Sequence, residues 1–153
     1  MCEHVFVIEL RQGNPREQGS IGEAIAASWL TQAGFSVWIP FGYSPDYDLV
    51  AGREDSLHRI QVKTSTQRQR ERWSVAICTR GGNQSWNKVI KRLEPTRYDY
   101  LFVVVADWRC WFIPASEMDA QSCIRVGGPK YARFEVDPPQ PFATATAERL
   151  LLT

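Results

Sequence analysis

The sequence has no uninterrupted apolar run of about 18 residues, the minimum for a membrane-spanning helix. Its first residues, MCEHVFVIE, carry acids within a short apolar stretch and lack a basic leader, which argues against a signal peptide. Internal repeats and low-complexity tracts are also missing. These absences predict a cytoplasmic protein with no membrane contact.

Closely spaced cysteine pairs, the usual mark of a structural zinc site, are missing as well. The chain holds four scattered cysteines and two histidines, which are Cys2, Cys78, Cys110, Cys123, His4 and His58. Their spacing disfavours a zinc centre and predicts buried free thiols.

Excess charge of one sign is missing from the whole chain, whose net charge is +1, but not from one segment. Residues 59–97 contain ten basic and two acidic side chains, so the remainder is acidic. A basic segment on a near-neutral protein favours a polyanionic partner. A solvated basic face is the competing interpretation.

With 153 residues, 44% of them hydrophobic, the chain is expected to form one globular domain over residues 1–153. Helices are expected at 20–33 and 85–93, and strands at 35–41, 47–51, 58–65, 73–79, 98–106, 110–113 and 131–136. Weaker signals are an edge strand at 5–10 and a short helix near 148–152. The order predicts an α/β fold in which helices lie on a mixed sheet.

Three local signals support these elements. Ser20 and Glu23 fit a capping box at the start of the first helix, and Gly34 fits its end. Apolar residues at 86, 89, 90 and 93 follow helical spacing. The unbroken apolar run 101–105 is typical of a strand covered on both faces.

The stretch RIQVKTS, residues 59–65, places Gln61, Lys63 and Ser65 on one face of its strand. A hairpin with its turn at residues 54–55 would put Asp48 opposite Gln61, with their Cβ atoms about 5 Å apart. A slip of one residue would break this pairing.

Charged groups on such a strand need a partner or a metal. One interpretation is a cross-strand ion pair between Asp48 and Lys63. The other adds Glu23, whose alternative role is the capping box. Two carboxylates, an amide oxygen and an ammonium group suit metal-assisted phosphodiester hydrolysis, because Mg²⁺ prefers oxygen ligands.

Three motifs, GSIGE at 19–23, PDYDLV at 45–50 and QVK at 61–63, resemble those of the PD-(D/E)xK nuclease superfamily. The sequence is most similar to group I intron-associated homing endonucleases, which are related to archaeal Holliday-junction resolvases. The similarity covers about residues 18–115. It implies a restriction-endonuclease-like αβββαβ core within residues 18–136, with extensions at 1–17 and 137–153.

The resemblance also implies a Mg²⁺-dependent DNA endonuclease, with Mn²⁺ as a substitute metal. Glu23, Asp48 and Gln61 would be the metal ligands, and Lys63 would complete the catalytic set. Gln61 departs from the family pattern, which has an acid there, so weaker metal binding is expected. Asp46 is the alternative aspartate, and Asp48 is preferred because it lies within the strand.

The implied partner is double-stranded DNA, which could be branched, and the enzyme is expected to be a homodimer or higher homo-oligomer. Predicted DNA contacts are Ser65, Arg68, Arg70, Arg72, Arg80, Lys88, Lys91 and Arg92. For Ser65 a polar strand end is the competing interpretation. Alternative functions are a junction resolvase, a restriction-like nuclease, an inactive DNA-binding nuclease fold, or an interaction protein that binds an acidic partner.

Overall fold

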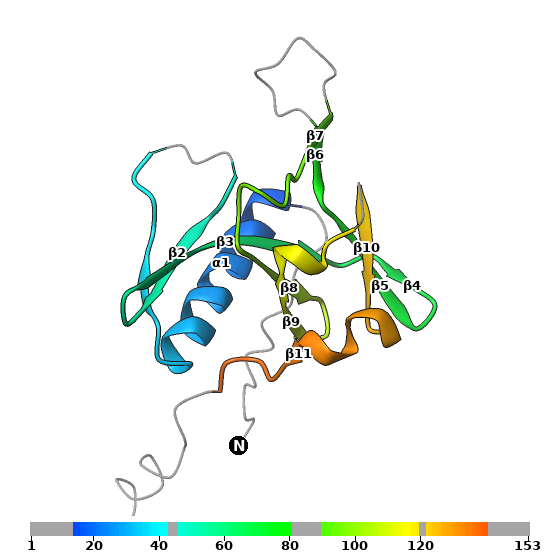
Figure 1. Ribbon diagram of the computed structural model, residues 1–153. Helices are drawn as coiled ribbons and strands as arrows, with labels where there is room; N and C mark the ends of the chain where they lie inside the picture. Colours follow the sequence, from blue (N-terminus) through cyan, green and yellow to red (C-terminus); the bar gives the residue numbers. More distant parts are fainter. Residues whose placement is uncertain (1–13, 43–45, 81–89, 120–121, 141–153) are drawn as a thin grey trace, which may run out of the picture.

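The computed structural model describes residues 14–42, 46–80, 90–119 and 122–140 (Figure 1). Its helices are α1 (Pro15–Gln32) and two short 3₁₀ helices, η1 (Ala115–Glu117) and η2 (Pro129–Phe134). Its strands are β1 (Ser36–Trp38), β2 (Leu49–Arg53), β3 (Ser56–Ser65), β4 (Arg68–Gln69), β5 (Arg72–Ala76), β6 (Cys78–Arg80), β7 (Ile90–Arg92), β8 (Tyr100–Val105), β9 (Cys110–Pro114), β10 (Cys123–Val126) and β11 (Glu135–Val136).

The architecture is a mixed six-stranded sheet with α1 packed across one face (Figure 1). The strand order is β1-β2-β3-β8-β9-β11, in which only β3 and β8 run parallel. A three-stranded sheet, β10-β5-β4, and the β6-β7 pair complete the described fold. The prediction of an α/β fold with a mixed central sheet is confirmed.

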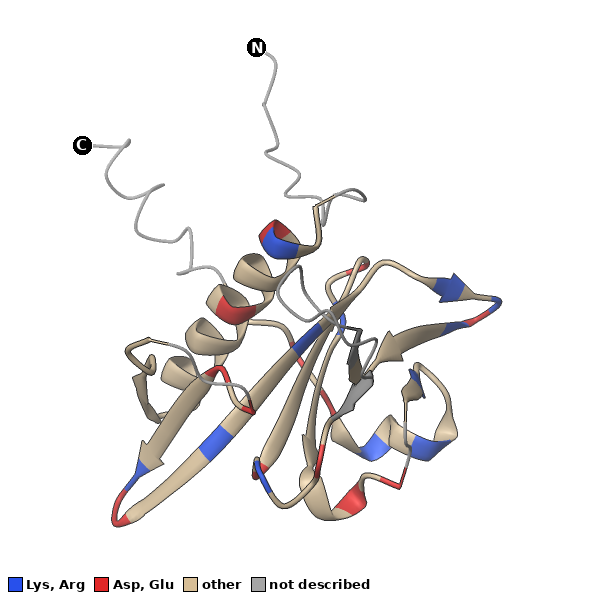
Figure 2. Cartoon of the chain, turned by 90° about the horizontal axis from the view of Figure 1, so that it is seen from above, with Lys and Arg blue, Asp and Glu red and all other residues tan. Residues whose placement is uncertain are grey.

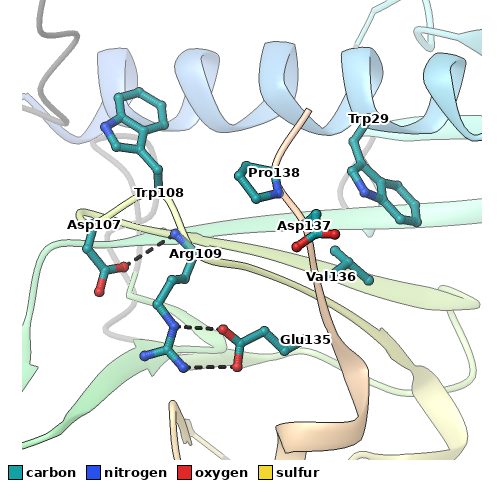
Figure 3. A pocket seen from close by; sticks show the side chains of 8 residues that line it. All are labelled: Trp29, Asp107, Trp108, Arg109, Glu135, Val136, Asp137 and Pro138. Carbon is teal, nitrogen blue, oxygen red and sulfur yellow. Dashed lines mark hydrogen bonds and ion pairs between the residues drawn. The ribbon is translucent and has the colours of Figure 1, made fainter. Parts of the chain in front are cut away.

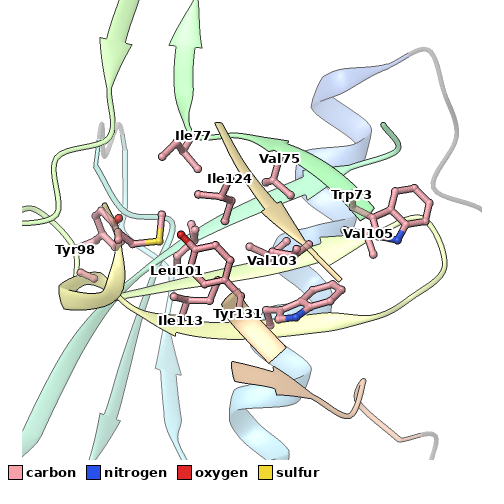
Figure 4. Close-up of a cluster of buried hydrophobic side chains, with 14 residues drawn as sticks. Trp73, Val75, Ile77, Tyr98, Leu101, Val103, Val105, Ile113, Ile124 and Tyr131 are labelled. Carbon is pink, nitrogen blue, oxygen red and sulfur yellow. The ribbon is translucent and has the colours of Figure 1, made fainter. Parts of the chain in front are cut away.

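Strand β8 lies between two hydrophobic clusters, as its unbroken apolar run predicted. Leu101, Val103 and Val105 pack with β5, β9, β10 and η2 in one cluster (Figure 4). Phe102 and Val104 face the other way, into the cluster beneath α1. Since successive side chains of a strand point to opposite faces, both sides of β8 are buried.

Helix α1 begins five residues earlier than predicted. The Asn14 side chain accepts hydrogen bonds from the backbone N–H groups of Arg16 and Glu17, and Pro15 occupies the first helical position. The capping box predicted at Ser20 is therefore wrong, because that residue lies inside the helix. The predicted end is confirmed by Gly34, which has φ 88° and closes a Schellman motif.

The β2–β3 hairpin has the predicted register. Leu49 lies opposite Ile60 and Arg53 opposite Ser56, so the two turn residues are Glu54 and Asp55. In this register Asp48, which directly precedes Leu49 in the chain, is the first residue beyond the paired positions at the open end of the hairpin.

Other expected elements differ. Of the helix predicted at 85–93, residues 90–92 form β7, paired with β6, and most of the rest lies outside the described residues. Most of the strand predicted at 131–136 is η2, which begins at the helix-favouring Gly128-Pro129 junction. The strand predicted at 73–79 is divided between β5 and β6, and the one at 35–41 shortens to β1. Strand β10 was not predicted.

Of the cysteines that the structure describes, Cys110 is buried, Cys78 is half-buried and Cys123 is exposed, so the expectation of buried thiols is correct only for the first. The strand expected at 5–10 and the helix near 148–152 lie outside the described residues. Within the described parts of the chain, no helix is long and apolar enough to cross a membrane.

Candidate active site

The candidate site lies at the edge of β3, where that strand extends beyond the end of β2. The backbone ladder stops near Ile60, whose carbonyl accepts a hydrogen bond from the Asp48 N–H at 2.8 Å. The next free edge amide, that of Val62, donates to Asp48 Oδ2 at 2.7 Å. The Asp48 carboxylate therefore takes the place of the missing strand and is held at the sheet edge.

Gln61 completes the anchoring of this carboxylate. Its side-chain Nε2 donates to Asp48 Oδ2 and also to the Val62 carbonyl at 3.3 Å. Gln61 is 6% exposed, so the amide is almost fully withdrawn from solvent. The hairpin register thus brings Asp48 and Gln61 into direct contact, as the turn position predicted.

Glu23 reaches the site because α1 approaches β3 closely at Gly22. A methyl group at Gly22 would overlap Thr64 Cγ2 and lie 3.4 Å from Val62 Cγ1. Only glycine leaves room for the helix at this distance. Gly22 therefore allows the close contact between α1 and β3, and this contact brings the carboxylate of the next residue, Glu23, to the site.

Lys63 lies on β3 beside these groups and forms no ion pair with any residue that the structure describes. The simple Asp48–Lys63 ion pair considered from the sequence is therefore not formed. Glu23, Asp48 and Lys63 instead line one pocket of about 310 Å³. Its remaining wall comes from the start of α1 and from β3, namely Pro15, Gln18, Gly19, Val62 and Thr64.

Burial changes the proton affinity of all three charged groups. Desolvation raises the pKa of Asp48, and the Val62 hydrogen bond and Lys63 only partly oppose it. Desolvation and the charge of Asp48 raise the pKa of Glu23. Desolvation lowers the pKa of Lys63 against the attraction of Asp48. The two carboxylates therefore repel each other in a partly dry pocket, an environment that a bound cation would stabilise.

The donor set fits a hard divalent cation. Glu23 and Asp48 bring carboxylate oxygens to the pocket, whereas Gln61 contacts Asp48 but is not among the residues that line the pocket. Carboxylate and amide oxygens are ligand types that Mg²⁺ and Mn²⁺ accept. No group of three His, Cys, Asp or Glu side chains occurs among the described residues, so the site holds two acids, not three.

A family model described as PD-(D/E)XK endonuclease matches residues 13–136. The chain belongs to this family. The match covers every residue of the candidate site and every described strand.

Two solved structures share the fold. A bacterial homing endonuclease, I-Ssp6803I, superimposes with a TM-score of 0.70 at 21% identity, covering 92% of this chain and 94% of that one. The Holliday junction resolvase Hjc of the archaeal hyperthermophile Archaeoglobus fulgidus has a TM-score of 0.50 at 16% identity, covering 78% and 91%. A comparison with curated protein sequences gives no significant match.

The two candidate aspartates have different surroundings. Asp46 lies outside the pocket lining, and its carboxylate forms an ion pair with Arg97 at 3.1 Å. Asp48 lines the pocket and contacts Gln61. The geometry therefore favours Asp48, the aspartate preferred from the sequence.

The predicted DNA contacts divide into three groups. Ser65 is 5% exposed, and its hydroxyl donates to the Ser74 carbonyl and accepts from the Gln67 N–H, which favours the polar strand end. Arg68, Arg70 and Arg72 are exposed on the β4–β5 hairpin. Arg80, Lys91 and Arg92 lie on β6 and β7 with their side chains outside the description, and Lys88 lies outside the described residues.

A larger pocket, of about 650 Å³, lies between the end of α1 and β11 (Figure 3). Of the three acids that line it, Glu135 is held by the Arg109 guanidinium through two hydrogen bonds of 2.7 and 2.9 Å, and Asp107 accepts a hydrogen bond from the Arg109 N–H. No lysine lines this pocket, so it lacks the combination of groups found beside Lys63.

The role of the Val62 amide could not be predicted from residue types, because a backbone group carries no sequence signal. The glycine at position 22 is visible in the GSIGE motif, but its packing reason follows only from the position of α1 on β3.

Proposed function

We propose that the protein is a Mg²⁺-dependent endonuclease that hydrolyses DNA phosphodiester bonds. The observation that carries the proposal is the convergence of Glu23, Asp48, Gln61 and Lys63 at one edge of the sheet. Family membership supports the reaction class, and the charge pattern of the pocket supports the use of a cation.

Each residue has a distinct role in this proposal. Glu23, Asp48 and Gln61 would hold the cation, with Mn²⁺ as a substitute. When bound, the cation would activate water and stabilise negative charge on the phosphate. Asp48 is oriented by the Val62 N–H, and Gln61 keeps it from rotating away. The Lys63 ammonium group, which forms no ion pair with a carboxylate of the described residues, is available to a phosphate oxygen.

Duplex DNA is the first proposed substrate, and branched DNA is the second. The names of the two similar structures, a homing endonuclease and a Holliday junction resolvase, support one substrate each. The higher TM-score of the homing endonuclease favours duplex DNA. An inactive DNA-binding fold is the remaining alternative, with Gln61 as its cause.

We also propose that the active enzyme is a homodimer or a higher homo-oligomer. One chain carries one site and therefore cuts one strand, whereas a double-strand break needs two copies. Sedimentation equilibrium with and without duplex DNA tests this, and a monomer under both conditions would contradict it.

The deciding experiment compares plasmid and four-way-junction substrates, each incubated with Mg²⁺ or EDTA. The proteins are the wild type, Lys63→Ala, and Lys130→Ala as a charge-matched control, because Lys130 is exposed and paired with Asp119. Mg²⁺-dependent cleavage that only Lys63→Ala abolishes would support the nuclease and show which substrate it prefers. Binding without cleavage by the wild type would favour the inactive fold.

A further inference from the structure

A second charged pocket lies outside the candidate active site. The β4–β5 hairpin and strand β10 form it, and its volume is about 630 Å³. The residues that line it are Gln69, Arg70, Glu71, Arg72 and Arg125. Figure 2 shows basic residues, all of them arginines, on this hairpin, which projects from the body of the protein on the side away from α1.

The arginines of this pocket have no acidic partners among the described residues. The single acid of the lining, Glu71, is paired with Arg68 at 3.4 Å. Arg70, Arg72 and Arg125 form no ion pair within the described parts of the chain. Three guanidinium groups thus line one cavity with their charge uncompensated.

Arg109, in the same region, is an arginine whose guanidinium group stabilises the fold, and it serves as a comparison for the pocket arginines. Its guanidinium donates two hydrogen bonds to Glu135 (Figure 3). It also lies 5.0 Å from the centre of the Trp111 ring. Arg68 is similar, because it donates to the Arg70 carbonyl at 3.1 Å and lies over the Trp73 ring. Within the part of the chain that the structure describes, the three pocket arginines form neither an ion pair nor a contact with an aromatic ring.

The position of Arg72 is fixed by its surroundings. A Cβ atom at Gly128 would lie 2.7 Å from Arg72 Nε, so the guanidinium lies directly against the glycine backbone. Gly127, with φ 86°, turns the chain there. The backbone of Gly128 therefore restricts the Arg72 side chain, because a larger residue at that position would overlap it.

Arg70 occupies a backbone conformation that arginine does not favour. Its φ is 56°, in the left-handed region where glycine or asparagine would be less strained. Arg70 is the first residue of a two-residue hairpin turn, a position that requires a positive φ, and Glu54 has the same φ of 55° at the matching position of the β2–β3 hairpin.

We propose that this pocket binds a phosphate group of the DNA backbone at a distance from the bond that is cut. The inference rests on the proposed function and names a contact surface for the same substrate. Arginine suits this role, because its planar group of donors matches phosphate oxygens and keeps its charge at all relevant pH values. Such contacts give affinity and position the DNA without reading its sequence.

The pocket is tied firmly to the catalytic strand. Ser65, two residues after Lys63, donates from its hydroxyl to the Ser74 carbonyl of β5 at 2.5 Å. The seven residues from Lys63 to Arg70 span at most about 25 Å when extended.

The test measures DNA affinity by fluorescence anisotropy in EDTA over a range of KCl concentrations. The variant is the double substitution Arg72→Gln and Arg125→Gln. Its control is Arg53→Gln combined with Arg133→Gln, two exposed arginines on other elements. The slope of log affinity against log salt should fall by about 0.9 for each phosphate that the variant no longer neutralises. The corresponding double lysine variant should keep the wild-type slope.

Plasmid cleavage with Mg²⁺ is measured in parallel. The glutamine variant should raise KM and leave kcat within about twofold, because the pocket does not touch the reacting atoms. An unchanged salt slope, or an equal fall in the control, would overturn the inference. Salt-independent binding by the wild type would also overturn it and would favour an acidic protein partner. A fall in slope with a wild type that never cleaves would support the pocket while refuting the nuclease.

Discussion

The two charged pockets of this protein differ in how their charges are held. Around Lys63 the charged groups are half-buried, come from three elements and alter one another's pKa values. Around Arg72 three exposed arginines form no ion pair among the described residues, and the one acid of the lining, Glu71, is paired with Arg68.

This difference separates chemistry from affinity. A site that moves protons and holds a cation needs few groups, closely fixed and withdrawn from water. A surface that attracts DNA needs many charges with access to solvent, because each one contributes a modest, salt-dependent share. Substitutions in the two pockets should therefore affect different measured quantities.

The largest effect is expected from Asp48→Asn. Removal of a carboxylate that holds the cation should lower kcat by at least about 100-fold, and DNA affinity in EDTA should stay near the wild-type value. The matched control, Asp46→Asn, removes the ion pair with Arg97 and should cost less than about tenfold. Equal falls in kcat from the two substitutions, measured by plasmid nicking, would contradict the assignment of the metal ligand.

Next in size is Gly22→Ala, which tests the approach of α1 to β3. The added methyl group would overlap Thr64, so the free energy of unfolding should fall by about 1–3 kcal/mol. Gly19→Ala is the control in the same helix, since no atom lies within 4 Å of that position. It should stabilise the helix by up to about 1 kcal/mol. Urea unfolding of both variants measures the contrast, which would fail if both changed stability equally.

A third substitution, Gln61→Glu, tests whether residue 61 contributes to cation binding in the pocket around Lys63. The new acid adds a negative charge beside Asp48 and removes the amide donor. We expect the Mg²⁺ concentration for half-maximal cleavage to fall about tenfold, and the melting temperature in EDTA to fall as well. Gln69→Glu, in the arginine pocket, adds the same charge and should leave the Mg²⁺ requirement unchanged. An unaltered Mg²⁺ requirement in Gln61→Glu would argue against Gln61 as a ligand.

The smallest effect concerns pH. Burial raises the pKa of Asp48 above 3.8 and that of Glu23 above 4.5, so the folded state binds more protons than the unfolded state just above these values. Stability in EDTA therefore falls as the pH rises through this window. Asp48→Asn removes the buried charge and should melt higher than the wild type near neutral pH, with the difference shrinking toward about pH 4. Thermal unfolding in EDTA measures the difference in melting temperature between the two proteins. A difference that does not vary with pH would show that the buried Asp48 charge is not its cause.

The lysine behaves in the opposite direction. Because desolvation lowers the pKa of Lys63 below 10.5, Lys63 loses its proton at a lower pH in the folded state than in the unfolded state. Its contribution to stability is therefore least at neutral pH and recovers toward alkaline pH.

The site could be predicted from the sequence where local rules decide the geometry. A two-residue turn and strict alternation fix the register of β2 and β3, so the contact between Asp48 and Gln61 was predictable. The apolar run of β8 likewise predicts a strand buried on both faces.

Prediction failed where distant segments compete with local patterns. Ile90 follows helical spacing, yet residues 90–92 pair with β6, a choice that no neighbouring residue reveals. Two cap signals compete at the start of α1, and the helix begins at Asn14-Pro15 instead of at Ser20. Alternation in Cys123-Ile-Arg-Val126 could have indicated β10, and with it the position of Arg125.

The hairpin that joins β2 to β3 also determines where the chain can change in length. A residue added inside either arm would turn Asp48 or Gln61 to the opposite face of the sheet and dismantle the site. A residue added at the exposed tip, between Glu54 and Asp55, would change the turn type but would leave the residues of both arms on their present faces of the sheet, with Leu49 and Ile60 in the core. This tip is therefore a natural point at which to insert a fluorophore tag or a linker to a second DNA-binding module.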